Sequence, residues 1–299
     1  MDGRKPFRRR LRGLRDRVAR RLFNTRIGRE VLIGGIGPRV LSMTVDCGDH
    51  IMSFSPSDYI GRKVFRKGNF DRDRVDRLLN ILRDNGLLRP DSTLLELGGN
   101  IGTQTVYFAL SKAFGRIVSV EPDPRNFALL RINIEQNKLG GAVTLINCAA
   151  GEKDAEIDFF QHRDNHGKSS VIRQSPGDRQ IVVPVRPVGT ILADAGVAWN
   201  EVGLAWVDVE GYEPQVCASM EVLLARRIPL YLEFSPAFYG PVKAAAFVRY
   251  LSAFYDDCVI FREEQATPAK VAAIPVDEPQ FDVLLFDAAI KEIASTGDR

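Results

Sequence analysis

Three carboxylates lie close together in the segment AWVDVEGYEP, where Asp208, Glu210 and Glu213 fall within six residues. The apolar residues before Asp208 are typical of a buried strand, and the proline after Glu213 is typical of the first turn of a helix. Carboxylates at the end of a strand can act as a general base or as oxygen ligands of a divalent ion. We therefore expect Asp208 and Glu210 to serve a site, whereas Glu213 suits a helix cap that complements the helix dipole.

Two further candidates come from other segments. Glu233 ends the next apolar run, LYLEF, and a parallel sheet would place it beside Asp208, although pairing with an arginine is an alternative. His166 follows His162 by four residues in QHRDNHGK, but Gly167 and the Asp-Asn content favour a loop over a helix that could present a metal pair. His166 is therefore a candidate base or substrate contact, with a solvated loop histidine as the default interpretation.

A glycine-rich turn follows an apolar run in LLELGGNIG. A nicotinamide-binding G-x-G-x-x-G pattern counted from Gly98 would need glycine where Asn100 and Thr103 stand, so two of its three positions fail. The pattern that remains is E-x-G-x-N-x-G, from Glu96 to Gly102. Asparagine tolerates positive φ better than other non-glycine residues, so a tight turn that lets a ligand approach the backbone is compatible with this sequence.

A second acidic residue is expected at the end of the next strand, where it would accept hydrogen bonds from ribose hydroxyls. Glu121 occupies this place in RIVSVEPDPRN, 25 residues after Glu96. Dinucleotide-binding folds also place an acid there, so Glu121 alone indicates only a nucleoside-binding fold. The turn, the acid and the order of strands together favour a cofactor site over a helix entry without a ligand.

These candidates need a framework that brings them together. From residue 71 onward, continuous apolar runs alternate with helical patterns, which predicts a parallel sheet covered by helices on both faces. We expect one α/β domain at residues 71–290 with a mainly parallel seven-stranded sheet. Polar, turn-rich sequence at 152–190 interrupts the alternation and indicates a hairpin-like insertion.

The chain begins with a strongly basic segment. Residues 1–29 hold 12 of the 41 basic and 2 of the 38 acidic residues, which leaves 29 basic and 36 acidic residues and a net charge of −7 for the rest. Apolar residues at helical spacing predict an amphipathic helix here: Phe7, Leu11, Leu14, Val18 and Leu22. Contact with a membrane surface, with a partner or with its own domain are the alternatives, and nucleic acid is disfavoured because no aromatic residues are interleaved. Residues 30–70 are expected to form a small β and loop extension, and residues 291–299 a tail.

The composition agrees with a globular protein of the cytoplasm, with peripheral membrane contact through the basic segment as an alternative. No run of 18 apolar residues occurs, which excludes a conventional membrane span. The four cysteines are scattered without a C-x-x-C pair, which favours reduced thiols over disulfides or a zinc site.

Several short motifs, in one order, resemble the FkbM family of S-adenosylmethionine-dependent methyltransferases. They cover roughly residues 70–236 and are LLELGGNIG, EPDPRN with Asn133 downstream, the turn at Ala149–Gly151, DVEGYE at 208–213 and LYLEFSP at 230–236. The resemblance implies a Rossmann-like class I methyltransferase fold and methylation of a hydroxyl, commonly on a sugar, a glycolipid or a secondary metabolite. It also implies S-adenosyl-L-methionine as cofactor, bound by residues of the first three motifs: Glu96, Gly98, Gly99, Asn100, Gly102, Glu121, Pro122 and Ala149.

Two positions depart from the family pattern. Trp206 stands where lysine is usual, and Gly189 stands where aspartate is usual; both are expected toward the substrate side. Methyl transfer from a sulfonium needs the nucleophile held in line with the methyl group, and an alcohol must also lose a proton to a base. The candidates for catalysis are Asp208, Glu210, Glu233 and His166. We favour catalysis by carboxylates without a metal, with a divalent ion at the acidic residues as the alternative.

Other functions of the same fold remain alternatives. A methyltransferase acting on nitrogen, on protein or on nucleic acid is disfavoured because the N/D-P-P-Y/F signature is absent and the chain beyond the basic segment is net acidic. A non-catalytic cofactor-binding module would keep the turn without turnover. An NAD-dependent oxidoreductase is the weakest alternative, because the glycine pattern does not match.

Overall fold

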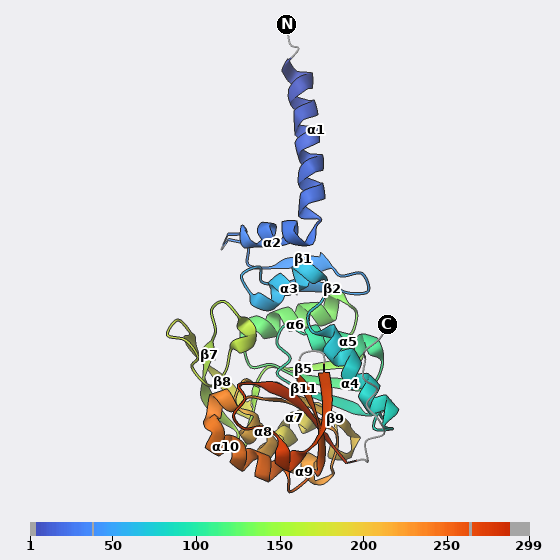
Figure 1. Cartoon of the computed structure of the whole chain (residues 1–299), viewed down its shortest axis with the longest axis vertical. Coiled ribbons are helices and arrows are strands. Elements are labelled where there is room, and N and C mark those ends of the chain that lie inside the picture. Colours follow the sequence, from blue (N-terminus) through green and yellow to red (C-terminus); the bar gives the residue numbers. More distant parts are fainter. Residues whose placement is uncertain (1–3, 38, 263–264, 288–299) are drawn as a thin grey trace. The chain divides into compact units, whose positions relative to one another are not determined.

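The computed structural model describes residues 4–37, 39–262 and 265–287, with side chains from residue 13 onward. The chain divides into two compact units, residues 1–70 and 71–299, and each is described by itself (Figure 1). The expected tail at 291–299 lies outside the described residues. No helix in the described part of the chain is both long and apolar enough to cross a bilayer.

The first unit combines helices with a small β ribbon. Its elements are α1 (Arg4–Phe23), α2 (Arg26–Gly34), β1 (Met43–Asp46), β2 (Ile51–Phe54) and α3 (Tyr59–Lys67). A single helix, α1, covers the amphipathic segment, and β1 pairs with β2 in antiparallel fashion. The Thr25 hydroxyl caps α2 by accepting the Gly28 N–H at 3.0 Å, so a second helix begins within the basic segment and continues past residue 29.

The second unit is built on one large mixed sheet. Its strands are β3 (Thr93–Leu97), β4 (Arg116–Val120), β5 (Val143–Ile146), β9 (Val202–Val207), β10 (Leu230–Phe234), β11 (Asp257–Arg262), β12 (Gln265–Lys270) and β13 (Phe281–Phe286). They lie side by side in the order β12-β11-β13-β10-β9-β3-β4-β5. The five from β5 to β10 are parallel, and β13 runs antiparallel to both of its neighbours. The predicted mainly parallel α/β fold is thereby confirmed.

The number of strands differs from the expected seven, because the described residues form eight in this sheet. The additional strand, β12, pairs antiparallel with β11 at the edge of the sheet. Its sequence, QATPAK, has no apolar alternation and contains a proline, which sheets tolerate at an edge. Because neither face of β12 is buried, its sequence has no hydrophobic pattern that would predict a strand.

Helices cover both faces of this sheet. They are α4 (Arg72–Asp84), α5 (Thr103–Ser111), α6 (Pro124–Gln136), α7 (Val188–Asp194), α8 (Glu213–Ser219), α9 (Glu221–Ala225) and α10 (Pro236–Leu251). Helices α7 to α10 share a hydrophobic core with Val207 and alternate residues of the neighbouring strands. Trp206 points to the opposite face, since side chains alternate along a strand, and contacts Phe108 of α5 edge to face at 5.5 Å.

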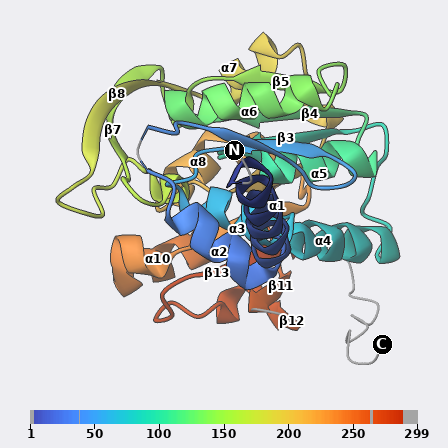
Figure 2. The ribbon, with the colours of Figure 1, turned by 90° about the horizontal axis from the view of Figure 1, so that it is seen from above.

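Between β5 and α7 the chain forms a separate three-stranded sheet. Its strands are β6 (Ala149–Ala150), β7 (Ala155–Gln161) and β8 (Arg179–Arg186), and β7 pairs antiparallel with β8. The β7–β8 pair projects from one side of the second unit in Figure 1 and in Figure 2. The connection between these two strands includes a short 3₁₀ turn, His166–Lys168, and returns residues 169–172 toward the end of β9.

Candidate active site

The glycine turn after β3 is held by backbone contacts. Gly98 and Gly99 both donate their N–H groups to the Val120 carbonyl at the end of β4, each at 2.9 Å. Asn100 has φ of 48°, so it adopts the left-handed backbone that its residue type was expected to tolerate. The sheet order reverses direction between β3 and β9, and ligands of α/β sheets bind at such a switch point.

Gly98 is required by the protein's own packing. Its φ is 98°, and a Cβ there would lie 1.8 Å from the Asp208 carbonyl oxygen. The Asp208 N–H also donates to the Leu97 carbonyl at 2.9 Å, so the end of β9 closes directly over the turn. We expected a small residue here so that a ligand could approach the backbone. In the structure, glycine is needed because the backbone of Asp208, the candidate base, lies against Gly98.

The two other glycines of the motif allow neighbouring elements to pack. A Cβ at Gly99 would lie 2.3 Å from the Ser119 hydroxyl oxygen, and one at Gly102 would lie 2.6 Å from a methyl carbon of Leu130 in α6. Gly102 also has φ of 87°, where a side chain is strained. The turn is thus enclosed by β4 and α6, which fixes the backbone on which a cofactor would lie.

Glu121 follows β4, and its carboxylate links the loop after β4 to the glycine turn after β3. Its carboxylate accepts the N–H groups of Asn100 and Asp123, each at 2.8 Å, and the side chain is buried. Burial raises the pKa of Glu121 to about 8, and the charge of Asp123 adds to the rise. Each carboxylate oxygen has a second lone pair, so Glu121 can still accept a hydroxyl from a ligand at this turn.

Glu96 lies beneath the turn, with no exposed surface. It accepts a hydrogen bond from the Thr105 hydroxyl of α5 at 2.5 Å, and burial raises its pKa to about 7. Its Oε1 atom and the Oδ1 atom of Asn100 have no hydrogen-bond partner among the described residues. Buried polar atoms without partners are costly, so these two acceptors fit a turn that holds a ligand rich in donors.

The remaining cofactor candidates follow the next strands along the sheet. The Asn147 side chain, after β5, donates to the Glu121 carbonyl at 2.7 Å and to the Pro122 carbonyl at 3.3 Å. Ala149 is buried in β6 opposite Val185. Pro122 and Ala149 thus stay candidates through their positions at the carboxyl ends of β4 and β5.

The three acidic candidates are brought together by the parallel pairing of β9 and β10. Val207 pairs with Leu232, so the next residues lie side by side: Asp208 directly follows the end of β9, and Glu233 is still within β10. Carboxylate oxygens of Asp208, Glu210 and Glu233 lie within 4.8 Å of one another. Glu210 has φ of 53°, a left-handed backbone that directs its side chain back to this acidic group.

These carboxylates strongly affect one another. Burial raises the pKa of Asp208, and Glu233 lies within hydrogen-bonding reach of it. Burial and the charge of Asp208 raise the pKa of Glu233 well above its ordinary value, and the same two causes raise the pKa of Glu210 to about 8. Close carboxylates cannot all be charged, so this acidic group holds protons near neutral pH. Its oxygens also suit a hard divalent cation.

The counter-charge comes from Arg74, which also pairs with a fourth acid, Asp282; the sequence revealed neither residue. Arg74 of α4 pairs with Asp282 of β13 at 3.1 Å, and its charge opposes the rise in the pKa of Asp208. Asp282 lies opposite Glu233 in the pairing of β10 with β13. The only signal for Asp282 was a charged residue inside the apolar run FDVLLF, and nothing local distinguished Arg74 from other helix arginines.

Glu213 is fully buried at the start of α8, where its Oε1 atom accepts the Gly211 N–H at 2.8 Å. It therefore stabilises the turn that presents Glu210. The expected helix cap is not what it forms, because Tyr212 is the N-cap of α8 and Glu213 is the first residue of the helix. His166 lies in the 3₁₀ turn of the insertion, and its carbonyl accepts the Asn126 side chain at 3.3 Å. Only 8% of His166 is exposed, so the default interpretation of a solvated loop histidine is wrong. His166 is not part of the acidic group.

The two departures from the family pattern are packing residues. Trp206 is 1% exposed and stacks on Tyr231 of β10, with ring centres 4.1 Å apart. Gly189 lies in α7, where a Cβ would come within 3.0 Å of the Trp199 ring. Both were expected toward the substrate; Trp206 instead packs between the sheet and α5, and Gly189 leaves room for the Trp199 ring.

Comparison with known proteins decides the family. Residues 96–257, more than half of the chain, match the family described as methyltransferase FkbM domain. The chain belongs to this family. The resemblance seen in the sequence motifs is thus confirmed, and the glycine turn, Glu121 and the acidic group all lie within the matched residues.

Two curated relatives support this membership. The 2-O-methyltransferase NoeI of Sinorhizobium fredii is 27% identical over 164 residues, which cover 50% of this chain and 65% of the relative. Methyltransferase 1 of Beauveria bassiana is 24% identical over 149 residues, which cover 44% of this chain and 59% of the relative. The chain therefore spans less than two thirds of either relative.

Two solved structures show a partly similar arrangement at low sequence identity. An O-methyltransferase from Bacillus cereus in complex with SAH has a TM-score of 0.40 and 13% identity, and covers 72% of this chain and 81% of its own. TYW2 of M. jannaschii in complex with AdoMet has a TM-score of 0.44 and 9% identity, and covers 85% of this chain and 90% of its own.

Proposed function

We propose that this protein transfers a methyl group from S-adenosyl-L-methionine to a hydroxyl oxygen of a small-molecule acceptor, such as a sugar, a glycolipid or a secondary metabolite. Family membership supports the reaction type. The observation that carries the proposal is the close approach of Gly98 to the backbone of Asp208, because Asp208 would then act as a base next to the turn that would hold the cofactor. The 2-O-methyltransferase name of one relative supports oxygen as the acceptor atom.

The residues of the turn are suited to the cofactor. When bound, S-adenosyl-L-methionine supplies an electrophilic methyl group on a positively charged sulfur. Glu121 would hold the ribose hydroxyls, and the unpartnered oxygens of Asn100 and Glu96 would accept hydrogen bonds from the ligand. Enclosure by β4 and α6 would exclude water from this side of the site.

The acidic group would manage the proton of the acceptor. Asp208 would take the hydroxyl proton, and Glu233, within hydrogen-bonding reach, would share it. The positive charge of Arg74 would keep part of the acidic group charged at neutral pH. Glu210, on its left-handed turn, would orient the acceptor.

Calorimetry with S-adenosylhomocysteine tests cofactor binding. At a pH above about 8, where Glu121 is charged, we expect binding to the wild type and a higher melting temperature, because its carboxylate would accept charge-assisted ribose hydrogen bonds. Glu121→Ala should weaken binding by about 2–4 kcal/mol. Glu135→Ala removes an exposed acid of α6 and serves as the matched control.

A screen of glycan and lipid-linked acceptors by mass spectrometry then tests transfer, with the gain of one methyl ether as the expected product. Tighter binding of NAD than of S-adenosylhomocysteine would contradict the proposal. Cofactor binding with no transfer to any acceptor would favour a non-catalytic module.

A further inference from the structure

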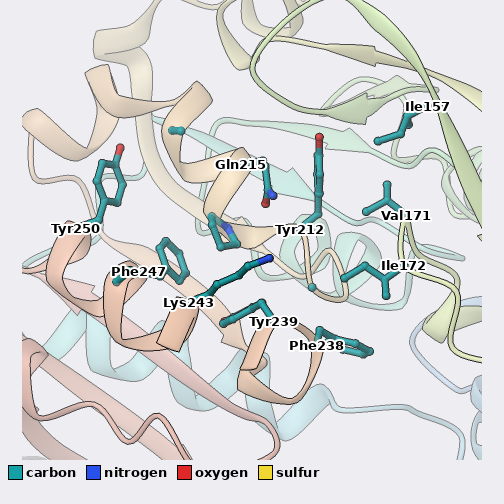
Figure 3. Close-up of a pocket in the computed structure, with 14 residues that line it drawn as sticks. Ile157, Val171, Ile172, Tyr212, Gln215, Phe238, Tyr239, Lys243, Phe247 and Tyr250 are labelled. Carbon is teal, nitrogen blue, oxygen red and sulfur yellow. The ribbon is translucent and has the colours of Figure 1, made fainter. Parts of the chain in front are cut away.

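A cavity of about 520 Å³ lies between α8, α10 and the insertion (Figure 3). Its size falls in the range of pockets that hold small organic ligands. The lining is mostly apolar and is dominated by five aromatic side chains: Tyr212, Phe238, Tyr239, Phe247 and Tyr250. Ile157, Val171 and Ile172 close the side formed by the insertion, as Figure 3 shows.

Two residues that line the cavity are adjacent in sequence to Glu210 of the acidic group. Gly211 and Tyr212 line it and directly follow Glu210. Gly211 has φ of 98°, and a Cβ there would lie 2.7 Å from Phe238 and 2.8 Å from Ile172, so the wall closes tightly around this residue. A molecule that fills the cavity would therefore have one end next to the turn that carries Glu210.

One charge is present among the lining residues, and it is positive. Lys243 extends from α10 into the cavity with its amine on the side of Tyr212 (Figure 3). Within the described ranges, no carboxylate forms an ion pair with Lys243, and the lining contains no acidic residue. An apolar cavity with a single cation is complementary to a ligand that combines an apolar part with one anionic group.

We propose that this cavity binds the part of the acceptor that is not methylated, and that this part is an apolar ring or chain bearing an anionic group placed against Lys243. The cavity can hold part of the acceptor only if the neighbouring Glu210 belongs to the methyl-transfer site, so the inference rests on the proposed function. Binding of an anionic amphiphile is a property of the cavity itself and does not depend on the cofactor.

Calorimetry on the full-length protein with three probes tests the inference. Octyl phosphate supplies both features, octyl glucoside supplies the chain without the charge, and inorganic phosphate supplies the charge alone. We expect octyl phosphate, below its micelle concentration, to bind at least about fivefold tighter than octyl glucoside, and inorganic phosphate to bind weakest.

Variants of the lining locate the binding. Lys243→Gln should weaken octyl phosphate about fivefold and leave octyl glucoside unchanged, whereas Arg249→Gln, an exposed cation of α10 outside the lining, should change neither. Ala218→Phe, at an exposed lining position of α8, should weaken both octyl ligands by filling the cavity. Melting curves confirm that each variant is folded.

The inference is overturned if Lys243→Gln binds octyl phosphate as the wild type does, or if inorganic phosphate binds as tightly as octyl phosphate. S-Adenosylhomocysteine titrated into the same proteins separates this outcome from the proposed function. If the protein binds S-adenosylhomocysteine but binds octyl phosphate no tighter than octyl glucoside, only the present inference is removed. Octyl phosphate binding that depends on Lys243, without nucleoside binding, removes the proposed function and keeps the cavity as an anionic-amphiphile site.

Discussion

Asp208 has charged neighbours of both signs, and they act in opposite directions on the pKa of its carboxyl group. Burial and the charge of Asp71 favour its protonated form, whereas Arg74 and the hydrogen bond with Glu233 favour its charged form. A base works best when its pKa lies near the working pH, because it must be charged before the reaction and able to keep the proton afterwards. The raised pKa of Asp208 moves it toward that range.

Asp208→Asn keeps the shape of the side chain and removes the base. We expect affinity for S-adenosylhomocysteine to stay within about tenfold and turnover to fall by roughly 10²–10⁴-fold. Calorimetry and initial rates measure the two quantities. Because we favour catalysis without metal, a chelator should leave the wild-type rate unchanged. Loss of activity with chelator and recovery with magnesium would instead assign the acidic group to a divalent ion.

Glu213 connects protonation to stability. Burial raises its pKa in the folded protein to about 8, whereas an unfolded glutamate titrates near its ordinary 4.5. Between these values the folded state keeps the proton and the unfolded state releases it, so the contribution of Glu213 to stability is full below about pH 4.5 and is lost as the pH rises toward 8.

Urea unfolding of the wild type and of Glu213→Gln at several pH values tests this linkage. The glutamine should flatten the fall in unfolding free energy between pH 5 and 8 by up to about 1.4 kcal/mol per pH unit. An identical pH dependence of both proteins would show that Glu213 is charged in the folded state.

At the scale of elements, the turn after β3 is shaped by its neighbours. Gly98→Ala should destabilise the fold by about 2–5 kcal/mol, because the methyl group meets the Asp208 carbonyl and the backbone is left-handed. Asn100→Gly is the matched control and should change stability by less than about 1 kcal/mol, because its φ of 48° suits glycine. Urea unfolding compares them, and equal stability of the two variants would disprove the role of packing at Gly98.

At the scale of the whole molecule, the first unit presents an apolar stripe on strongly basic helices. Five apolar side chains of α1 and α2 are between 54% and 77% exposed: Leu14, Val18, Leu22, Ile27 and Val31. Basic helices with an exposed apolar face bind anionic membrane surfaces, since lysines and arginines contact the headgroups while the apolar side chains enter the interface. We propose that an anionic lipid surface is the partner of this stripe.

Replacing Leu14, Val18 and Leu22 with serine tests this role without cutting α2, which a deletion of residues 1–29 would do. We expect sedimentation with phosphatidylglycerol vesicles to be lost, cofactor affinity to be unchanged, and wild-type binding to weaken in salt. Val182→Ser with Val222→Ser removes exposed apolar residues elsewhere and is the control. Vesicle binding that survives the triple substitution would indicate that the stripe packs on its own protein or on a partner.

The sequence by itself determined features that depend on neighbouring residues. Apolar runs and helical spacing predicted the parallel sheet, and the types of residue in LLELGGNIG predicted a turn that tolerates positive φ at Asn100. The proximity of Asp208 and Glu233 could also be predicted, because both lie at the carboxyl ends of apolar runs that form parallel strands. Such inferences succeed because backbone preferences and hydrophobic periodicity are local properties.

Only the tertiary structure decided contacts between distant segments. The Asp208 carbonyl over Gly98 and the pairing of Arg74 with Asp282, 208 residues apart, depend on which strands and helices become neighbours. The burial of His166 depends on α6, and the aromatic cavity needs α8, α10 and the insertion together. Nothing local to any of these segments encodes its partner, because such contacts are chosen by the packing of the whole core.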